Sequence, residues 1–179
     1  DADLASGATI YMGSLIWGIE AAVNNAAYLG AASGDELVIT HISNNTSSKS
    51  ATAEEAGVAQ VDANVAVVTK NGDVITSCII DAVQSKAEFG ADGVVATEAG
   101  NVASKNQLGE NYGMKGFSGI GKEWNEQAAA FAAYVTGKTA EEVAGTALTE
   151  TTAPAEADLA SSVTISVGGF MALIEKIAK

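Results

Sequence analysis

Two helical patterns of apolar residues lie near opposite ends of the chain. After Thr9, apolar side chains recur at the i, i+1, i+4, i+7 and i+8 spacing of an amphipathic helix. They are Leu15, Ile16, Ile19, Ala22, Val23 and Ala26, and the corresponding set near the C-terminus is Phe170, Met171, Ile174 and Ile177. Each pattern predicts a helix that buries one stripe, and Gly30 is the expected end of the first helix.

Between these helices the pattern changes to that of β-strands. The segment Glu36–Ile42 is rich in β-branched residues, Gly57–Lys70 alternates at every second position, and Asp73–Asp81 resumes strand character. Asn71-Gly72 separates the last two segments. It predicts a hairpin, because both residues of such a turn must accept positive φ.

The second half of the chain returns to helical patterns. A glycine-rich segment, 108–121, leads into a helix whose buried face begins at Trp124 and which is followed by Gly137 at the C′ position. Thr139 and Glu142 have the spacing of a capping box. The order of elements predicts an α+β fold, with an antiparallel β-sheet packed against helices.

The opening of the chain is repeated near its end. Asp3–Ile10 reads DLASGATI and Asp158–Ile165 reads DLASSVTI, and at this offset ten of the first twenty residues are identical. Self-similarity at a fixed spacing is typical of repeat proteins. We therefore expect 1–34 to be the closing strand and helix of a preceding repeat, 35–179 to be a complete α+β repeat domain, and the N-terminal helix to duplicate the C-terminal one.

The composition excludes some classes of partner. The formal net charge is −13 and arginine is absent, so bidentate recognition of phosphates or bases has no natural donor and nucleic acid is not expected as a partner. The apolar segments are too short to predict a membrane span. Acidic, aromatic-poor composition favours a secreted or cell-surface location, and a start at Asp1 fits either a mature secreted form or a fragment of a longer protein.

Candidate catalytic side chains are few. Cys78 is the single cysteine and His41 the single histidine, so neither an intramolecular disulfide nor a paired-histidine metal site is expected within one chain. Cys78 lies in an apolar strand, as a small core residue does. We find no nucleophile and base in a recognisable arrangement, and the sequence leaves open whether the chain is an enzyme.

One short motif has chemical content. Asp3, Ser6, Gly7, Ala8 and Thr9 resemble the flavin-acceptor signature of FMN-binding domains, in which the threonine hydroxyl is esterified to the FMN phosphate. The resemblance implies FMN attached covalently at Thr9, with Thr164 at the matching position of the second copy. The alternative is a turn and N-cap that open a packed helix in both copies.

The glycine loop is a second candidate contact region for an anion. Gly119 and Gly121 precede a helix, with Lys115 and Lys122 close in sequence. Free amides at a helix start bind phosphate, which makes the two glycines candidate contacts for a flavin phosphate. The alternative is that the two glycines allow the chain to reverse direction with close packing.

A broader resemblance covers residues 35–179. Four phrases carry it: Gly57–Asp62, Asn71–Ile75, Gly109–Lys115 and Gly119–Ala128. They are similar to segments of secreted tandem-repeat proteins of anaerobic Firmicutes, which also resemble FMN-binding domains. The resemblance implies a domain that occurs in tandem copies. We also expect self-association, as a homopolymer or as tandem repeats, because the apolar face of the N-terminal helix must be covered.

Two functions from different classes follow. The first is an extracellular FMN-binding-like module that carries flavin for electron transfer to an unidentified redox partner. The second is a non-enzymatic surface or filament subunit that assembles by donating its N-terminal tail to a neighbouring subunit, since a heterologous donation that does not close produces a fibre.

Overall fold

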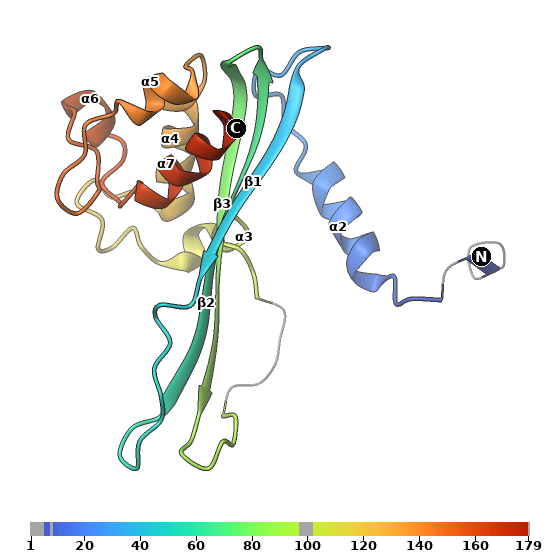
Figure 1. Ribbon diagram of the computed structural model, residues 1–179, viewed down its shortest axis with the longest axis vertical. Coiled ribbons are helices and arrows are strands. Elements are labelled where there is room, and N and C mark those ends of the chain that lie inside the picture. The colour runs from blue at the N-terminus through green and yellow to red at the C-terminus, as the bar shows by residue number, and fades with distance from the viewer. Residues whose placement is uncertain (1–5, 8, 97–101, 179) are drawn as a thin grey trace.

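A three-stranded antiparallel sheet with helices on one face forms the body of the protein. The computed structural model describes residues 6, 7, 9–96 and 102–178. The strands are β1 (Glu36–Asn44), β2 (Gly57–Asn71) and β3 (Val74–Phe89), in the order β1-β2-β3 (Figure 1). The helices are α2 (Gly13–Asn24), α3 (Lys105–Leu108), α4 (Trp124–Val135), α5 (Ala140–Ala144), α6 (Ala157–Ala160) and α7 (Gly168–Glu175), with 3-10 turns at Gly109–Tyr112 and Lys176–Ala178. The expected α+β class is confirmed.

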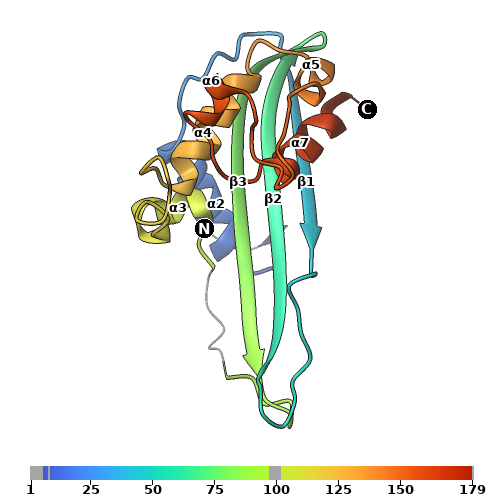
Figure 2. The same ribbon diagram turned by 90° about the vertical axis from the view of Figure 1, so that its left-hand side faces the viewer.

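The hairpin between β2 and β3 is built around the predicted turn. Asn71 pairs with Val74, and Gly72 has a φ of +58°. Strand β3 runs to Phe89, eight residues beyond the expected end at Asp81, because its second half pairs with the first half of β2. The two strands therefore form a long arm that extends past the helices (Figure 2).

The core lies between one face of the sheet and helices α4 and α7. Phe131 of α4 and Leu173 and Ile174 of α7 are fully buried there, against Ala66 and Val68 of β2. Phe170 packs edge-on against Trp124, with 5.6 Å between ring centroids. Burial of this apolar surface is the main stabilisation of the fold.

Helix α4 begins and ends where the sequence predicts. It starts at Trp124, and Gly137 in the C′ position has a φ of +86°. The Gly137 N–H donates to the Ile75 carbonyl at 2.7 Å, and the Ile75 N–H donates to the Lys138 carbonyl at 2.9 Å. The end of α4 is thus bonded to the start of β3. The capping box of Thr139 and Glu142 opens α5 as expected.

Helix α2 departs from expectation. It ends at Asn24 and not at Gly30. The side chain and the N–H of the C-cap residue Asn25 both bond the Ala21 carbonyl, at 2.8 and 3.0 Å. Segment 25–35 then leads to the start of β1. Figures 1 and 2 place α2 on the side of the sheet opposite to α4, α5 and α7.

Candidate functional site

The N-terminal motif lies at the surface ahead of α2. Ser6 and Gly7 form part of a helical turn, and both residues and Thr9 are exposed. Asp3 and Ala8, which complete the predicted flavin-acceptor signature, lie outside the described residues. The motif therefore leads into α2, which begins at Gly13.

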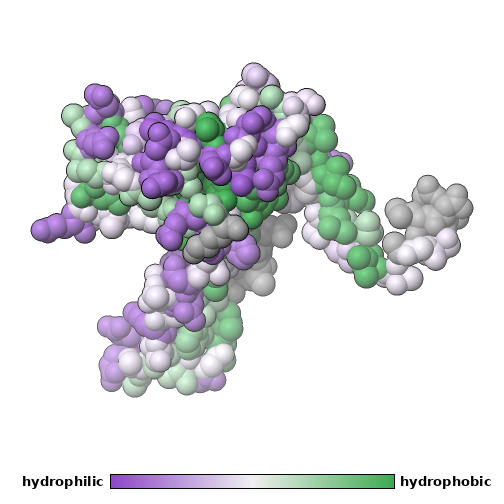
Figure 3. Space-filling model, turned by 45° about the horizontal axis from the view of Figure 1, so that its top comes forward, coloured by the Kyte–Doolittle hydropathy of each residue, from purple (hydrophilic) through white to green (hydrophobic). Residues whose placement is uncertain are grey.

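Helix α2 has an apolar surface that no other described element covers. No residue of α2 is buried. Its large apolar side chains are between 50% and 70% exposed: Leu15, Ile16, Trp17, Ile19 and Val23. Figure 3 shows the helix as a hydrophobic segment that projects from the body. The expectation that this helix buries one stripe is wrong within the single chain.

The C-terminal copy of the same motif has the opposite environment. Helix α7 begins at Gly168, the residue matched with Gly13, and the residues before the two helices have similar conformations, with φ of −95° at Met12 and −107° at Val167. Ile174, matched with Ile19, is fully buried, so the expected stripe is confirmed for α7. That the two helices are duplicates stays a prediction.

A buried glutamine joins the second copy to the glycine loop. Gln127 of α4 is 0% exposed. Its Oε1 accepts hydrogen bonds from the Thr164 N–H at 2.8 Å, the Thr164 hydroxyl at 3.2 Å and the Ile165 N–H at 3.3 Å. Its Nε2 donates to the Lys122 carbonyl at 3.2 Å and to the Ser118 hydroxyl at 3.3 Å. The structure thus links Thr164 to the loop that contains Gly119 and Gly121.

The glycine loop is held by oxygen atoms of the protein itself. The buried Glu123 carboxylate accepts the N–H groups of Met114 and Lys115, both at 2.9 Å. The Ser118 hydroxyl lies 3.4 Å from the Ile120 and Lys122 nitrogens. Those amides are therefore directed at internal acceptors, an arrangement that stabilises a chain reversal.

Gly119 and Gly121 follow the geometry of that reversal. Gly121 has a φ of +64°, which glycine adopts without strain, and its N–H donates to the Ser118 carbonyl at 3.0 Å. A Cβ at Gly119 would meet nothing within 4 Å, so close approach of the chain does not require glycine there. The contact of these glycines with a flavin phosphate stays a prediction.

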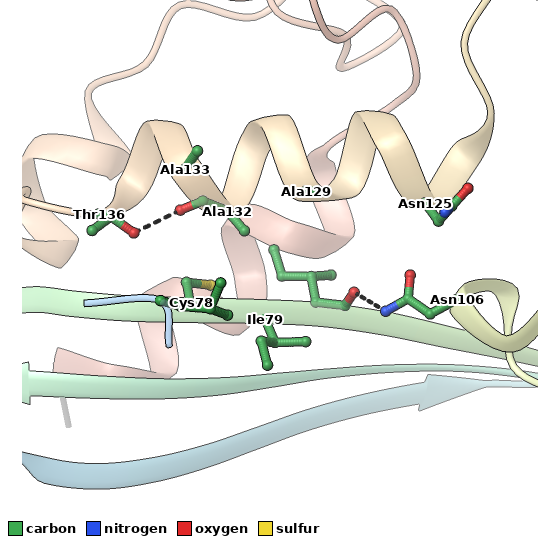
Figure 4. A pocket seen from close by; sticks show the side chains of 10 residues that line it. Cys78, Ile79, Asn106, Asn125, Ala129, Ala132, Ala133 and Thr136 are labelled. Carbon is green, nitrogen blue, oxygen red and sulfur yellow. Dashed lines mark hydrogen bonds between the residues drawn. The ribbon is translucent and has the colours of Figure 1, made fainter. Parts of the chain in front are cut away.

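A groove of about 320 Å³ between β3 and α4 receives the tail (Figure 4). Leu29 of the tail lines it together with Cys78, Asn106, Asn125 and residues of α4. Burial raises the pKa of the Cys78 thiol to about 12, which keeps it protonated and unreactive at neutral pH. Asn125 Oδ1 is buried and has no hydrogen-bond partner within the described part of the chain.

Two further residues fix where the tail crosses the sheet. Gly30 has a φ of +114°, and a Cβ there would lie 2.5 Å from the Thr76 carbonyl oxygen. The Asp35 carboxylate accepts hydrogen bonds from the Thr76 hydroxyl at 2.6 Å, the Ala32 N–H at 2.8 Å and Asn71 Nδ2 at 3.3 Å. These bonds, that of Thr76 foremost, lower the pKa of Asp35.

This anchor was missed by sequence reasoning. The only sequence signal was Gly30, which was interpreted as the end of the first helix. The side-chain bonds of Asp35 to Asn71 and Thr76 reach residues 36 and 41 positions away in sequence. The pattern of neighbouring residues does not indicate them.

A second hollow lies beside the start of α2. Its volume is about 730 Å³, and its lining includes Tyr11, Trp17, Val102 and Gln107. Thr9 is two residues from Tyr11 in sequence. The volume is within the range of roughly 300–1,000 Å³ that is typical of small-molecule sites.

Comparison of the chain with protein-family models, curated proteins and solved structures gave no match. Within the ranges that the structure describes, no cluster of three or more His, Cys, Asp or Glu side chains is arranged to hold a metal ion. None of the described helices is long and apolar enough to cross a membrane.

Proposed function

We propose that the protein is a non-enzymatic structural subunit that self-associates by donating its N-terminal tail to a neighbouring copy. The observation that carries the proposal is helix α2, which has an apolar stripe and no buried residue. Large apolar surfaces that remain exposed on a monomer are typical of interaction sites.

Burial of the apolar side chains of α2 against another molecule is energetically favourable. Complete burial of a Val, Leu, Ile or Phe side chain is favourable by about 1.5–3 kcal/mol. Five large apolar side chains of α2 are half exposed or more. Four of them, Leu15, Ile16, Ile19 and Val23, share one face of the helix. Even partial burial of these four in a neighbour would supply several kcal/mol toward association, since each contributes a share of that value.

The direction of donation sets the form of the assembly. The donated tail and the surface that receives it are different parts of the chain, so each contact is heterologous. A heterologous contact produces a ring if the rotation between subunits closes and a filament if it does not. The same geometry suits a secreted or cell-surface polymer.

The test compares the full chain with a variant of the apolar stripe. We expect the wild type to sediment faster as its concentration rises, and the Leu15→Ser, Ile19→Ser double variant to stay at the single-chain mass of 18.0 kDa. Ala21→Ser, on the other side of the helix, is the matched control and should associate like the wild type. Association of the double variant at wild-type strength, or a wild type that is monomeric at every concentration, contradicts the proposal.

A second candidate function is flavin carriage, alone or within the same polymer. The specific support is the hollow beside the start of α2, whose lining includes Tyr11, two residues after Thr9 in sequence, and Trp17. Aromatic rings favour stacked arrangements with one another, and a bound isoalloxazine would stack in the same way. Thr9 would hold the FMN phosphate covalently, and the flavin would supply electron transfer.

The flavin proposal is tested by intact mass. Protein isolated from its native source should be heavier than the sequence by one FMN-phosphoryl group. Thr9→Val should remove the extra mass, whereas Thr164→Val at the matching position should retain it. An unmodified mass for the wild type contradicts flavin carriage and leaves the assembly proposal intact.

A further inference from the structure

The face of the sheet opposite to the core has no helix packed along it in the described chain. Side chains alternate between the two faces of a strand. Thr40 of β1 bonds the Leu173 carbonyl of α7 at 3.0 Å, and Ala66 and Val68 of β2 are in the core. Ile39, which precedes Thr40, and Val67, which separates Ala66 from Val68, therefore point to the other side of the sheet. We name that side the open face.

Apolar side chains gather in the middle of the open face. Ile39 pairs with Val67, and Val67 pairs with Ile79, so these three form one row across the sheet. Ile39 is 62% exposed and Ile79 is 45% exposed. Leu37 and Val65 lie one step along the strands on either side of this row. Helices cover one face of this sheet, and the other face presents apolar side chains of the kind that a second layer of helices covers.

The central row of the open face and α2 are both poor in charge. In the next row Asp81 pairs with Val65 on the edge strand β3, where its carboxylate accepts the Asn106 N–H at 3.1 Å. The chain has a net charge of −13, yet Glu20 is the only charged residue among the twelve of α2. The central row of the open face consists of Ile39, Val67 and Ile79. The centres of protein interfaces are depleted in charged residues. Two copies of so acidic a chain meet with least repulsion where both surfaces carry little charge.

The two surfaces also match in length. Twelve helical residues span about 18 Å. Along β1, the open face extends from Leu37 to Ser43, which is about 20 Å at the rise of a strand. A single helix of the length of α2 therefore covers the apolar centre of the open face.

The tail anchor keeps α2 away from the open face of its own chain. Leu29 lines the groove beside β3, and Gly30 approaches the Thr76 carbonyl too closely for any side chain. The bonds of Asp35 to Thr76 and Asn71 hold the other end of the crossing. Helix α2 leaves this anchored crossing at an angle to the sheet (Figure 1). Its exposed stripe is thereby presented to another molecule.

We propose that α2 of one chain packs on the open face of a second copy, across Ile39, Val67 and Ile79. This inference rests on the proposed function, for which it names the receiving surface. The occupant is a second copy because the chain itself carries both an unpacked helix and an uncovered sheet face. Each chain is then both donor and acceptor, and the assembly grows head to tail.

The experiment separates donor from acceptor with two charge variants of the full chain. Ile19→Asp removes the donor surface, and Ile39→Asp removes the acceptor surface. Each side chain is more than half exposed, so both variants keep the fold of the monomer, which circular dichroism and chemical unfolding verify. Ser85→Asp, further along β3 on the same face, adds the same charge outside the region covered by α2 and is the control.

Each variant alone should sediment as a monomer. An equimolar mixture should form a dimer, at twice the 18.0 kDa of one chain, because the mixture retains one intact donor and one intact acceptor per pair. The wild type and Ser85→Asp should form larger species. The mixture should therefore stop at two chains at concentrations where the wild type continues to grow.

The outcomes distinguish this inference from the proposed function. If Ile39→Asp associates like the wild type while Ile19→Asp does not, the tail is donated to another surface and the open face is excluded. If neither the wild type nor any variant associates, donation itself fails. If Ser85→Asp is as defective as Ile39→Asp, added charge and not the site explains the loss, and the inference is overturned.

Discussion

Helices α2 and α7 share a sequence pattern and differ in environment. Both begin at glycines 155 positions apart and follow residues of similar backbone conformation. Ile174 of α7 is fully buried, whereas the matched Ile19 of α2 is 66% exposed. An amphipathic pattern therefore predicts that a helix forms and which face is apolar, but not that the same chain contains a surface for that face.

The position of each helix in the chain explains the difference. Helix α7 follows both the sheet and α4, and it packs where β1, β2 and α4 already present apolar side chains. Helix α2 precedes the sheet, and the anchored crossing at residues 29–35 leads it to the opposite side. The other face of the sheet is occupied by α4 and α7, so α2 cannot pack there.

The largest expected effect is the difference in stability between variants at the two matched isoleucines. Ile174→Ala should lower the free energy of unfolding by about 2–5 kcal/mol, because it leaves a cavity in the core. Ile19→Ala, measured at a dilution where the protein is monomeric, should change it by about 0.5 kcal/mol or less, as an exposed substitution does. Urea unfolding of both variants measures the two values. Similar losses at the two positions would show that α2 is packed within the monomer.

A somewhat smaller effect concerns the turn before α7. Gln127→Leu should lower the free energy of unfolding by about 2–4 kcal/mol, because a buried N–H left without an acceptor costs about 1–3 kcal/mol and both Thr164 and Ile165 lose theirs. Asn125→Leu, on the same helix, removes an unpartnered buried oxygen and should cost much less. Chemical unfolding compares the two. Equal costs would mean that Gln127 acts only by filling volume.

The smallest effect concerns the tail anchor and its dependence on pH. Hydrogen bonds lower the pKa of folded Asp35 below its ordinary value of 3.8, so its carboxylate stabilises the fold above that pH. The contribution is lost as the pH falls through the lower, folded pKa. Asp35→Asn should therefore be less stable than the wild type at pH 7, and the difference should shrink below pH 3.8. A difference that is the same at pH 7 and pH 3 would exclude the charged anchor.

Local features of the fold were predictable, and the long-range ones were not. The Asn71-Gly72 turn, the end of α4 at Gly137 and the cap at Thr139 depend on residues a few positions apart, and each was found where expected. The sixteen-residue length of β3 depends on the partner strand, and it was underestimated.

The candidate site shows the same limit. Thr164 and the glycine loop were chosen for separate reasons, and only the structure shows that Gln127 joins them. Gln127 itself has no distinctive sequence context within its helix. A buried polar side chain is recognised by the groups it bonds, and those that bond Gln127 Oε1 belong to Thr164 and Ile165, 37 and 38 residues away in sequence.

The sequence by itself determined which segments become helices and strands, where the tight turns lie, and that two segments 155 residues apart share one apolar pattern. These properties follow from backbone preferences and side-chain periodicity within a few residues. Only the tertiary structure decided that one of those helices is buried and the other exposed, and that no helix of the described residues packs along one face of the sheet. Burial depends on which surfaces the folded chain brings within reach of each other, and that is a property of the whole packing arrangement.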